Sequence, residues 1–161
     1  MHNRHSLRRL LVALLSGFFA FFCAVFAAAL CVPLPLDRIR TYPVSPFVMD
    51  RNARPLAIRL SEASEYCVPI SLDKMGRWLP LVVVGVEDHR FRDHPGVDPL
   101  ALFRAVQQNI RAGSVVSGAS TISSQLIRLS FPRPRTLRTK ALEFLQALAM
   151  ERKLDKDAIL E

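Results

Sequence analysis

The sequence EDHRFRDHPGVD, residues 87–98, directly follows the apolar run 79–86. It gathers four acids, two histidines and two arginines. An apolar segment that ends in the acid pair Glu87-Asp88 can place a carboxylate at the edge of a low-dielectric cleft, where a general base can work. The same composition also fits a capped helix end with a solvated charge cluster. The residues on either side of the segment decide between these two interpretations.

The N-terminus has the pattern of a membrane anchor. Residues 1–9 contain Arg4, Arg8 and Arg9 and no acid, and we interpret them as a cytoplasmic tail. Residues 10–32 carry no charge and are long enough to span a bilayer as a helix. A cleavable signal peptide is the alternative, with a small-residue site at 27–29. The length of the apolar run favours an uncleaved anchor, and both interpretations place the rest of the chain outside the cytoplasm.

The net charge of +8 together with half of the residues being hydrophobic is unusual for a soluble cytosolic domain. Only Cys67 lies beyond the apolar segment, because Cys23 and Cys31 fall within it. The exported part therefore has no disulfide framework, and no Cys/His spacing indicates zinc. Nothing in the sequence resembles a nucleic-acid-binding module, so we expect no nucleic-acid partner.

We expect a linker with short strands over residues 33–73, of which 33–46 are extended. Strands at 47–49 and 56–58 flank the polar turn 50–54.

From residue 74 onward the chain is predicted to be mainly helical. The first helix covers 74–86, and a second begins at Pro99 after Asp98 as N-cap and closes at Gly113. Ser120 is expected to cap a helix over 121–129. The remaining predicted helices cover 137–153 and the segment that begins at 154.

Two further clusters carry chemistry. Residues 117–125 are rich in hydroxyls, and Gly118 permits close backbone approach, so this loop and helix start can bind an anion or serve only as a capped turn. Residues 128–140 then hold five cations and no acid, which fits a solvated face, a membrane-surface patch, or a site for a phosphate or pyrophosphate ligand. Glu143 follows Lys140 at helical spacing, as its ion-pair partner or as part of a site. A carboxylate, a cationic cradle and a membrane anchor together indicate an anionic, lipid-linked substrate.

The three clusters resemble, in order and spacing, the peptidoglycan glycosyltransferase domain of class A penicillin-binding proteins and monofunctional transglycosylases, glycosyltransferase family 51. Residues 87–96 resemble the first motif of that family, residues 118–125 the second, and Lys140 with Glu143 the third. Glu151 and residues 156–161 resemble the start of the fourth. The amino-acid sequence at 117–121 and at 132–136 is most similar to that of the penicillin-binding protein 1C branch.

The resemblance implies a lysozyme-like fold that polymerises lipid II into β-1,4 glycan strands for cell-wall biosynthesis, with loss of undecaprenyl pyrophosphate. Glu87 would be the general base, and Glu143 would assist the leaving pyrophosphate directly or through a divalent cation (Mg²⁺ or Mn²⁺). No protein metal ligand is assigned. The expected partners are lipid II, the growing glycan strand, the membrane and other cell-wall synthesis proteins. The expected location is the bacterial inner membrane, with a single span and the catalytic part in the periplasm. The residues expected to bind substrate are Asp88, Phe91, His94, Gly118, Ser120, Thr121, Gln125, Arg128 and Lys140.

The sequence departs from the family pattern at three places. Ser124 stands where the family often has Gln, and Thr139 where it usually has Arg. The fourth motif stops at Glu161, so residues 74–161 are expected to form only the N-terminal part of the domain. The alternative to an enzyme is therefore a catalytically inactive, membrane-anchored remnant that binds lipid II or a partner. A glycan-cleaving enzyme is disfavoured, because a neutral glycan needs no phosphate cradle.

Overall fold

The computed structural model describes residues 13, 16–17, 20 and 23–161, and residues 23–31 are helical. Much of the expected membrane helix, 10–32, thus lies outside the described residues. Within the described part of the chain, no helix combines the length and apolar character needed to cross a bilayer.

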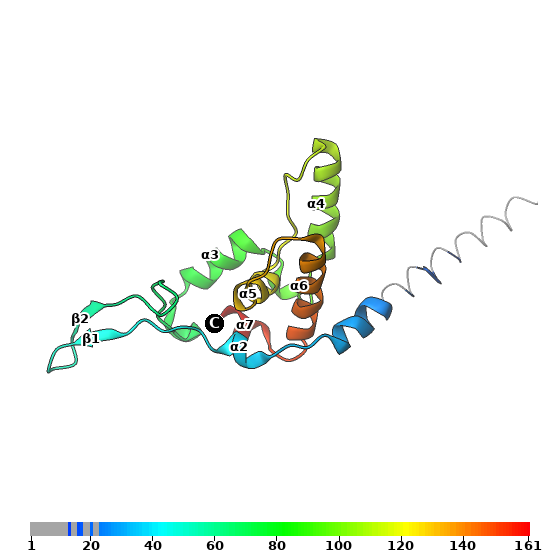
Figure 1. The fold of residues 1–161 in the computed structure, drawn as a ribbon. Coiled ribbons are helices and arrows are strands. Elements are labelled where there is room, and N and C mark those ends of the chain that lie inside the picture. The colour runs from blue at the N-terminus through cyan, green and yellow to red at the C-terminus, as the bar shows by residue number, and fades with distance from the viewer. Residues whose placement is uncertain (1–12, 14–15, 18–19, 21–22) are drawn as a thin grey trace, which may run out of the picture.

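The described fold is mainly helical with one small sheet, as expected (Figure 1). Its elements are, in order, α2 (Leu36–Arg40), β1 (Phe47–Met49), β2 (Pro55–Ile58), α3 (Trp78–Glu87), α4 (Pro99–Ala112), α5 (Ile122–Ser130), α6 (Leu137–Met150) and α7 (Lys156–Leu160). Short 3-10 turns lie at Leu72–Lys74 and Phe91–Asp93.

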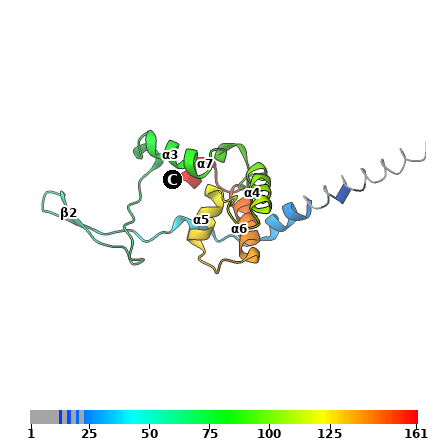
Figure 2. The same ribbon diagram turned by 90° about the horizontal axis from the view of Figure 1, so that it is seen from above.

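The predicted hairpin is confirmed: β1 and β2 pair antiparallel, with Phe47 opposite Ile58. Its turn contains no glycine. The Asp50 carboxylate holds it instead, by accepting hydrogen bonds from the backbone N–H groups of Asn52 (2.7 Å) and Arg54 (2.8 Å). The hairpin stands apart from the helices in both views (Figures 1 and 2).

The core lies where α5 packs against α6, with α2 and α7 also against α5. Phe91, Ile127, Ala147 and Met150 are completely buried there. The first residues after the 23–31 helix join this core, since Leu34 and Ile39 are both buried. The prediction that 33–46 is entirely extended is therefore wrong at α2. Its Leu36 and Ile39 are three residues apart, so one helical turn packs both against the core.

The start and end of α4 are as predicted. Asp98 is its N-cap and accepts from Leu100 N at 2.9 Å, and Gly113 closes the helix in the left-handed region. The expected apolar face is not covered by the described residues, because only Ala105 of α4 is buried.

Other helix bounds differ from the prediction. The helix expected from residue 74 begins only at Trp78, and α6 ends at Met150 instead of 153. The cap of α5 is Thr121, not Ser120. Two neighbouring hydroxyl residues offer the same local signal, and contacts elsewhere in the fold decide which of them caps the helix.

Replacing Asp98 with alanine should destabilise the fold near neutral pH. Burial raises the pKa of Asp98, but the backbone N–H groups of Ala101 and Leu100 and the Arg90 guanidinium outweigh it and hold the pKa below its ordinary 3.8. We expect Asp98→Ala to lower the free energy of unfolding by about 1–2 kcal/mol. A lowered acid pKa gives stability that is complete above the unfolded value and lost as pH falls through the folded value. Denaturant titrations at neutral and at strongly acidic pH should therefore show the difference shrinking in acid.

Asp98→Asn is the matched control, because its amide oxygen can still cap α4 while the charge is gone. Its stability at neutral pH should lie between those of the unmutated chain and Asp98→Ala, because it keeps the cap and loses the ion pair with Arg90. An Asp98→Ala penalty that is the same in acid would contradict a role for the ionised carboxylate.

Candidate active site

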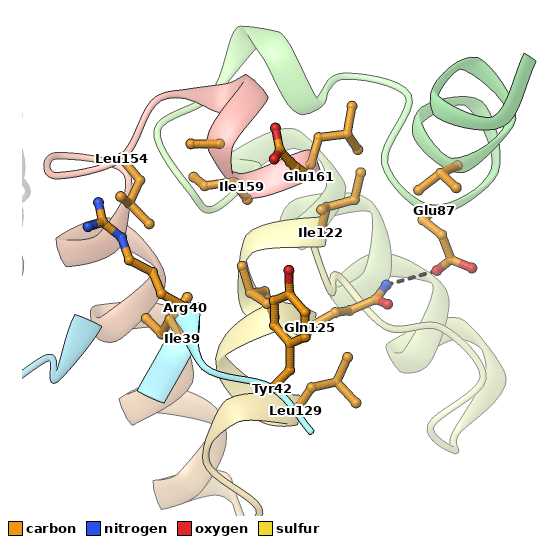
Figure 3. A pocket seen from close by; sticks show the side chains of 14 residues that line it. Ile39, Arg40, Tyr42, Glu87, Ile122, Gln125, Leu129, Leu154, Ile159 and Glu161 are labelled. Carbon is orange, nitrogen blue, oxygen red and sulfur yellow. Dashed lines mark hydrogen bonds between the residues drawn. The ribbon is translucent and has the colours of Figure 1, made fainter. Parts of the chain in front are cut away.

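Glu87 is the last residue of α3, and its exposed carboxylate faces α5. Gln125, in the first turn and a half of α5, donates from Nε2 to Glu87 Oε2 at 2.8 Å (Figure 3). Glu87 lies on the wall of a cavity of about 520 Å³. Most of the other lining side chains are apolar. Those labelled in Figure 3 come from α2 and the segment just after it, α5, the 154 turn, and α7 with the residue that follows it.

A second, smaller cavity of about 200 Å³ also has Glu87 in its lining. Its lining residues are Val86, Glu87, Asp88, His89, Asp98, Ala101, Arg104, Gly118, Ala119, Ser120 and Thr121. The structure thus brings the first and second sequence clusters together around one hollow. Glu87 borders both cavities, one mostly apolar and one rich in polar groups.

Asp88 and His94, by contrast, are buried and bonded to each other. His94 Nε2 lies 3.0 Å from Asp88 Oδ2, and Gly96 N donates to His94 Nδ1 at 3.2 Å. Because Nδ1 accepts a hydrogen bond, the proton of the neutral ring is on Nε2, which donates to Asp88. Asp88 Oδ2 also accepts from Ile122 N at 3.2 Å, so the carboxylate lies at the positive N-terminus of α5.

A second set of bonds fixes the same helix start. Thr121 Oγ1 donates to Gly96 O at 2.6 Å, and Thr121 and Ser124 bond reciprocally as a capping box. Ser124, where the family often has Gln, is buried in this cap. In this chain that position therefore serves the helix start.

Lys140 reaches the end of the hydroxyl-rich loop. Its Nζ donates to Ser120 Oγ at 2.7 Å and lies 3.8 Å from Glu143 Oε2. Burial lowers the pKa of Lys140 and the Arg128 charge lowers it further, while Glu143 opposes both. Burial therefore destabilises the charged form of Lys140, and an anion bound beside the ammonium would stabilise that form again.

The other predicted substrate-binding residues lie in different surroundings. Phe91 is completely buried, whereas Gly118 and Arg128 are exposed. Glu143 is buried and, among the described residues, lines neither of the cavities that Glu87 borders. In the described part of the chain no three acidic, histidine or cysteine side chains gather as ligands for a metal ion.

The linker was not predicted to lie at the site. Ile39, Arg40 and Tyr42 nevertheless line the larger cavity (Figure 3). The only local signal was the spacing of Leu36 and Ile39, which suits one turn of an amphipathic helix.

Comparison with known proteins identifies the family of the chain. Residues 55–161 match the transglycosylase family. The chain is 38% identical to penicillin-binding protein 1B of Haemophilus influenzae over 69% of its length, which is 14% of that protein. It is 30% identical to penicillin-binding protein 1C of Escherichia coli over 92% of its length, or 19% of that protein. A third relative, penicillin-binding protein 1A of Aquifex aeolicus, is 43% identical over 57% of the chain and 13% of that protein.

The chain therefore spans less than a fifth of the length of these relatives. The family match covers the α3–α7 helices, the smaller cavity and every residue of the three clusters. It also covers the lining of the larger cavity except Ile39, Arg40 and Tyr42. On these grounds the chain belongs to the transglycosylase family and carries a transglycosylase domain segment of the kind found in class A penicillin-binding proteins.

Proposed function

We propose that this chain polymerises lipid II into β-1,4-linked glycan strands and releases undecaprenyl pyrophosphate. The observation that carries the proposal is the place of Glu87, an exposed carboxylate that borders two cavities at once. Joining two sugars requires a base within reach of the acceptor hydroxyl and a donor whose anomeric carbon that hydroxyl can attack, so the binding sites of the two sugars must meet beside the base. The lysozyme-like architecture is part of the same proposal.

In this mechanism Glu87 removes the proton from the acceptor's 4-hydroxyl. The freed oxygen attacks the anomeric carbon of the donor, and the bond from that carbon to the pyrophosphate breaks with inversion from α to β. Gln125 holds one carboxylate oxygen of Glu87, at 2.8 Å, and so orients the other toward the hydroxyl.

Lys140 and Ser120 stabilise the negative charge that develops on the leaving pyrophosphate. A cation fixed in a partly dry site stabilises such charge better than water does. Glu143 holds this ammonium from the buried side, 3.8 Å away, and assists the leaving group through it. Arg128, in the last turn of α5, adds positive charge close enough to Lys140 to act on its ammonium.

A divalent cation at the pyrophosphate is a further part of the proposal. Mg²⁺ can be bound by one or two carboxylates together with substrate phosphates. Glu143 lies beside Lys140, 3.8 Å away, and this pairing makes it a poor metal ligand on its own. We further propose a single-pass location in the inner membrane, with this domain in the periplasm.

The test is to incubate the whole chain in detergent or vesicles with labelled lipid II and to separate the products by length. Labelled glycan strands would support the proposal. Binding of lipid II without any product would contradict it and favour a binding remnant. Soluble fragments released from preformed glycan would instead point to a cleaving enzyme.

A further inference from the structure

Behind the site lies a buried bridge of charged groups that the proposed mechanism does not use. Glu151 follows the last residue of α6, and its side chain is only 5% exposed. One of its carboxylate oxygens accepts a hydrogen bond from the Ser123 hydroxyl of α5. The other lies 2.5 Å from Lys156 Nζ, at the start of α7. One carboxylate therefore ties the α5, α6 and α7 helices together.

Lys156 extends this bridge to the loop that follows Glu87. Its Nζ donates to the backbone oxygen of His94 at 2.6 Å and lies 4.3 Å above the centre of the Phe91 ring. The ring is fully buried, so the ammonium is packed against it with little room to move. His94 is therefore bound at two points: Lys156 donates to its backbone oxygen, and its ring nitrogen Nε2 bonds to the Asp88 carboxylate.

Both supports of the Glu87 carboxylate connect to this bridge. Asp88 is the next residue in the chain, and its partner His94 is fixed by Lys156. Gln125, which bonds to Glu87 directly, lies two residues after Ser123 on the same helix. A change at Glu151 can therefore displace Glu87 from two directions.

We propose that Glu151, through Ser123 and Lys156, is a positioning residue that fixes the geometry of the Glu87 base. The proposal rests on the function proposed above. Removing a buried partner leaves the other charge without compensation, so the loop shifts until Lys156 finds water or another acceptor. A shift of about 1 Å at a reacting group can cost on the order of a hundredfold in rate.

The test compares Glu151→Gln with Lys156→Gln in the whole chain. The isosteric amide in Glu151→Gln can still accept from Ser123, but it no longer carries the charge that Lys156 needs. We expect kcat for glycan formation to fall by about tenfold or more, with KM changed less than about twofold, because Lys140 and Ser120 are untouched. Lys156→Arg, which keeps the positive charge, should restore part of the rate that Lys156→Gln loses.

Asp157→Asn is the matched control. Asp157 also joins α7 to this loop, through Arg92 at 2.7 Å, but both side chains are more than half exposed. An exposed ion pair contributes little, so this variant should keep the wild-type kcat and KM. An equal loss in Asp157→Asn would show that any link to α7 matters, and would overturn the assignment to Glu151.

A second readout does not depend on turnover. The His94 ring nitrogens and the Gly96 amide should shift in NMR spectra of Glu151→Gln and stay in place in Asp157→Asn. A rise in KM at constant kcat, or unmoved His94 signals in a folded variant, would overturn the proposal. If the unmutated chain makes no glycan, the proposed function fails, and the His94 signals alone decide on the bridge. If Glu151→Gln unfolds, Lys156→Gln tests the same ion pair by changing its other partner. In that variant Glu151 keeps its hydrogen bond from the Ser123 hydroxyl.

Discussion

Glu87→Gln is expected to abolish glycan polymerisation and to leave the fold unchanged. The amide has the same shape as the carboxylate, and its oxygen can still accept from Gln125, but it cannot take up the acceptor's proton. A positioned general base typically contributes about 10²–10⁴ in rate, so product should fall at least about a hundredfold. The measurement is the polymerisation of labelled lipid II, with circular dichroism and thermal unfolding recorded on the same samples.

Glu62→Gln is the control for this substitution. Glu62 is an exposed glutamate that lines neither of the two cavities that Glu87 borders. The same loss of one charge should there leave the yield and length of the glycan unchanged. Turnover of Glu87→Gln close to that of the unmutated chain would remove Glu87 from the role of base.

Local signals in the sequence predicted most of the secondary structure. The bounds of α4 follow from local signals, which are Asp98 before Pro99 at its start and Gly113 at its end. These residues act on the backbone within one helical turn, so the bounds do not depend on contacts with distant parts of the chain. The hairpin followed from its strands and from Asp50 in the same way. The start of α5 could not be placed as well, because Ser120 is held by Lys140 and Thr121 by Gly96, residues about twenty positions away or more.

The site was predicted in its composition but not in its arrangement. Sequence grouped Asp88, Phe91 and His94 with Glu87 as neighbours in one motif. The structure gives these three residues internal contacts: Phe91 and His94 line neither cavity, and Asp88 borders only the smaller one, whereas Glu87 borders both. Which member of a charged cluster turns inward depends on partners that arrive from later helices, such as Ile122 N and Lys156, and a one-dimensional pattern does not contain them.

Gly96→Ala should be the most damaging small substitution in the domain. Gly96 has φ of 102°, and a Cβ built there would lie 2.7 Å from the carbonyl oxygen of Ala147 and 2.8 Å from its carbon. Both atoms belong to the backbone of α6 and cannot rotate away. Overpacking costs about 1–3 kcal/mol and the positive φ adds about 1–2, a large share of a marginal stability of about 5–15 kcal/mol. The expected result is a free energy of unfolding lower by roughly 3 kcal/mol in denaturant titrations.

Gly113→Ala separates the two causes of this loss. Gly113 also has a positive φ, 63°, but a Cβ there would meet no atom within 4 Å. Its penalty should be only the backbone strain of about 1–2 kcal/mol. The additional loss of unfolding free energy at Gly96 then measures the steric overlap of the new Cβ with the backbone of α6. Since Gly96 O also holds Thr121, that excess should be accompanied by loss of glycan synthesis at temperatures where the variant is still folded. Equal penalties at the two glycines would contradict the close approach of the loop to Ala147.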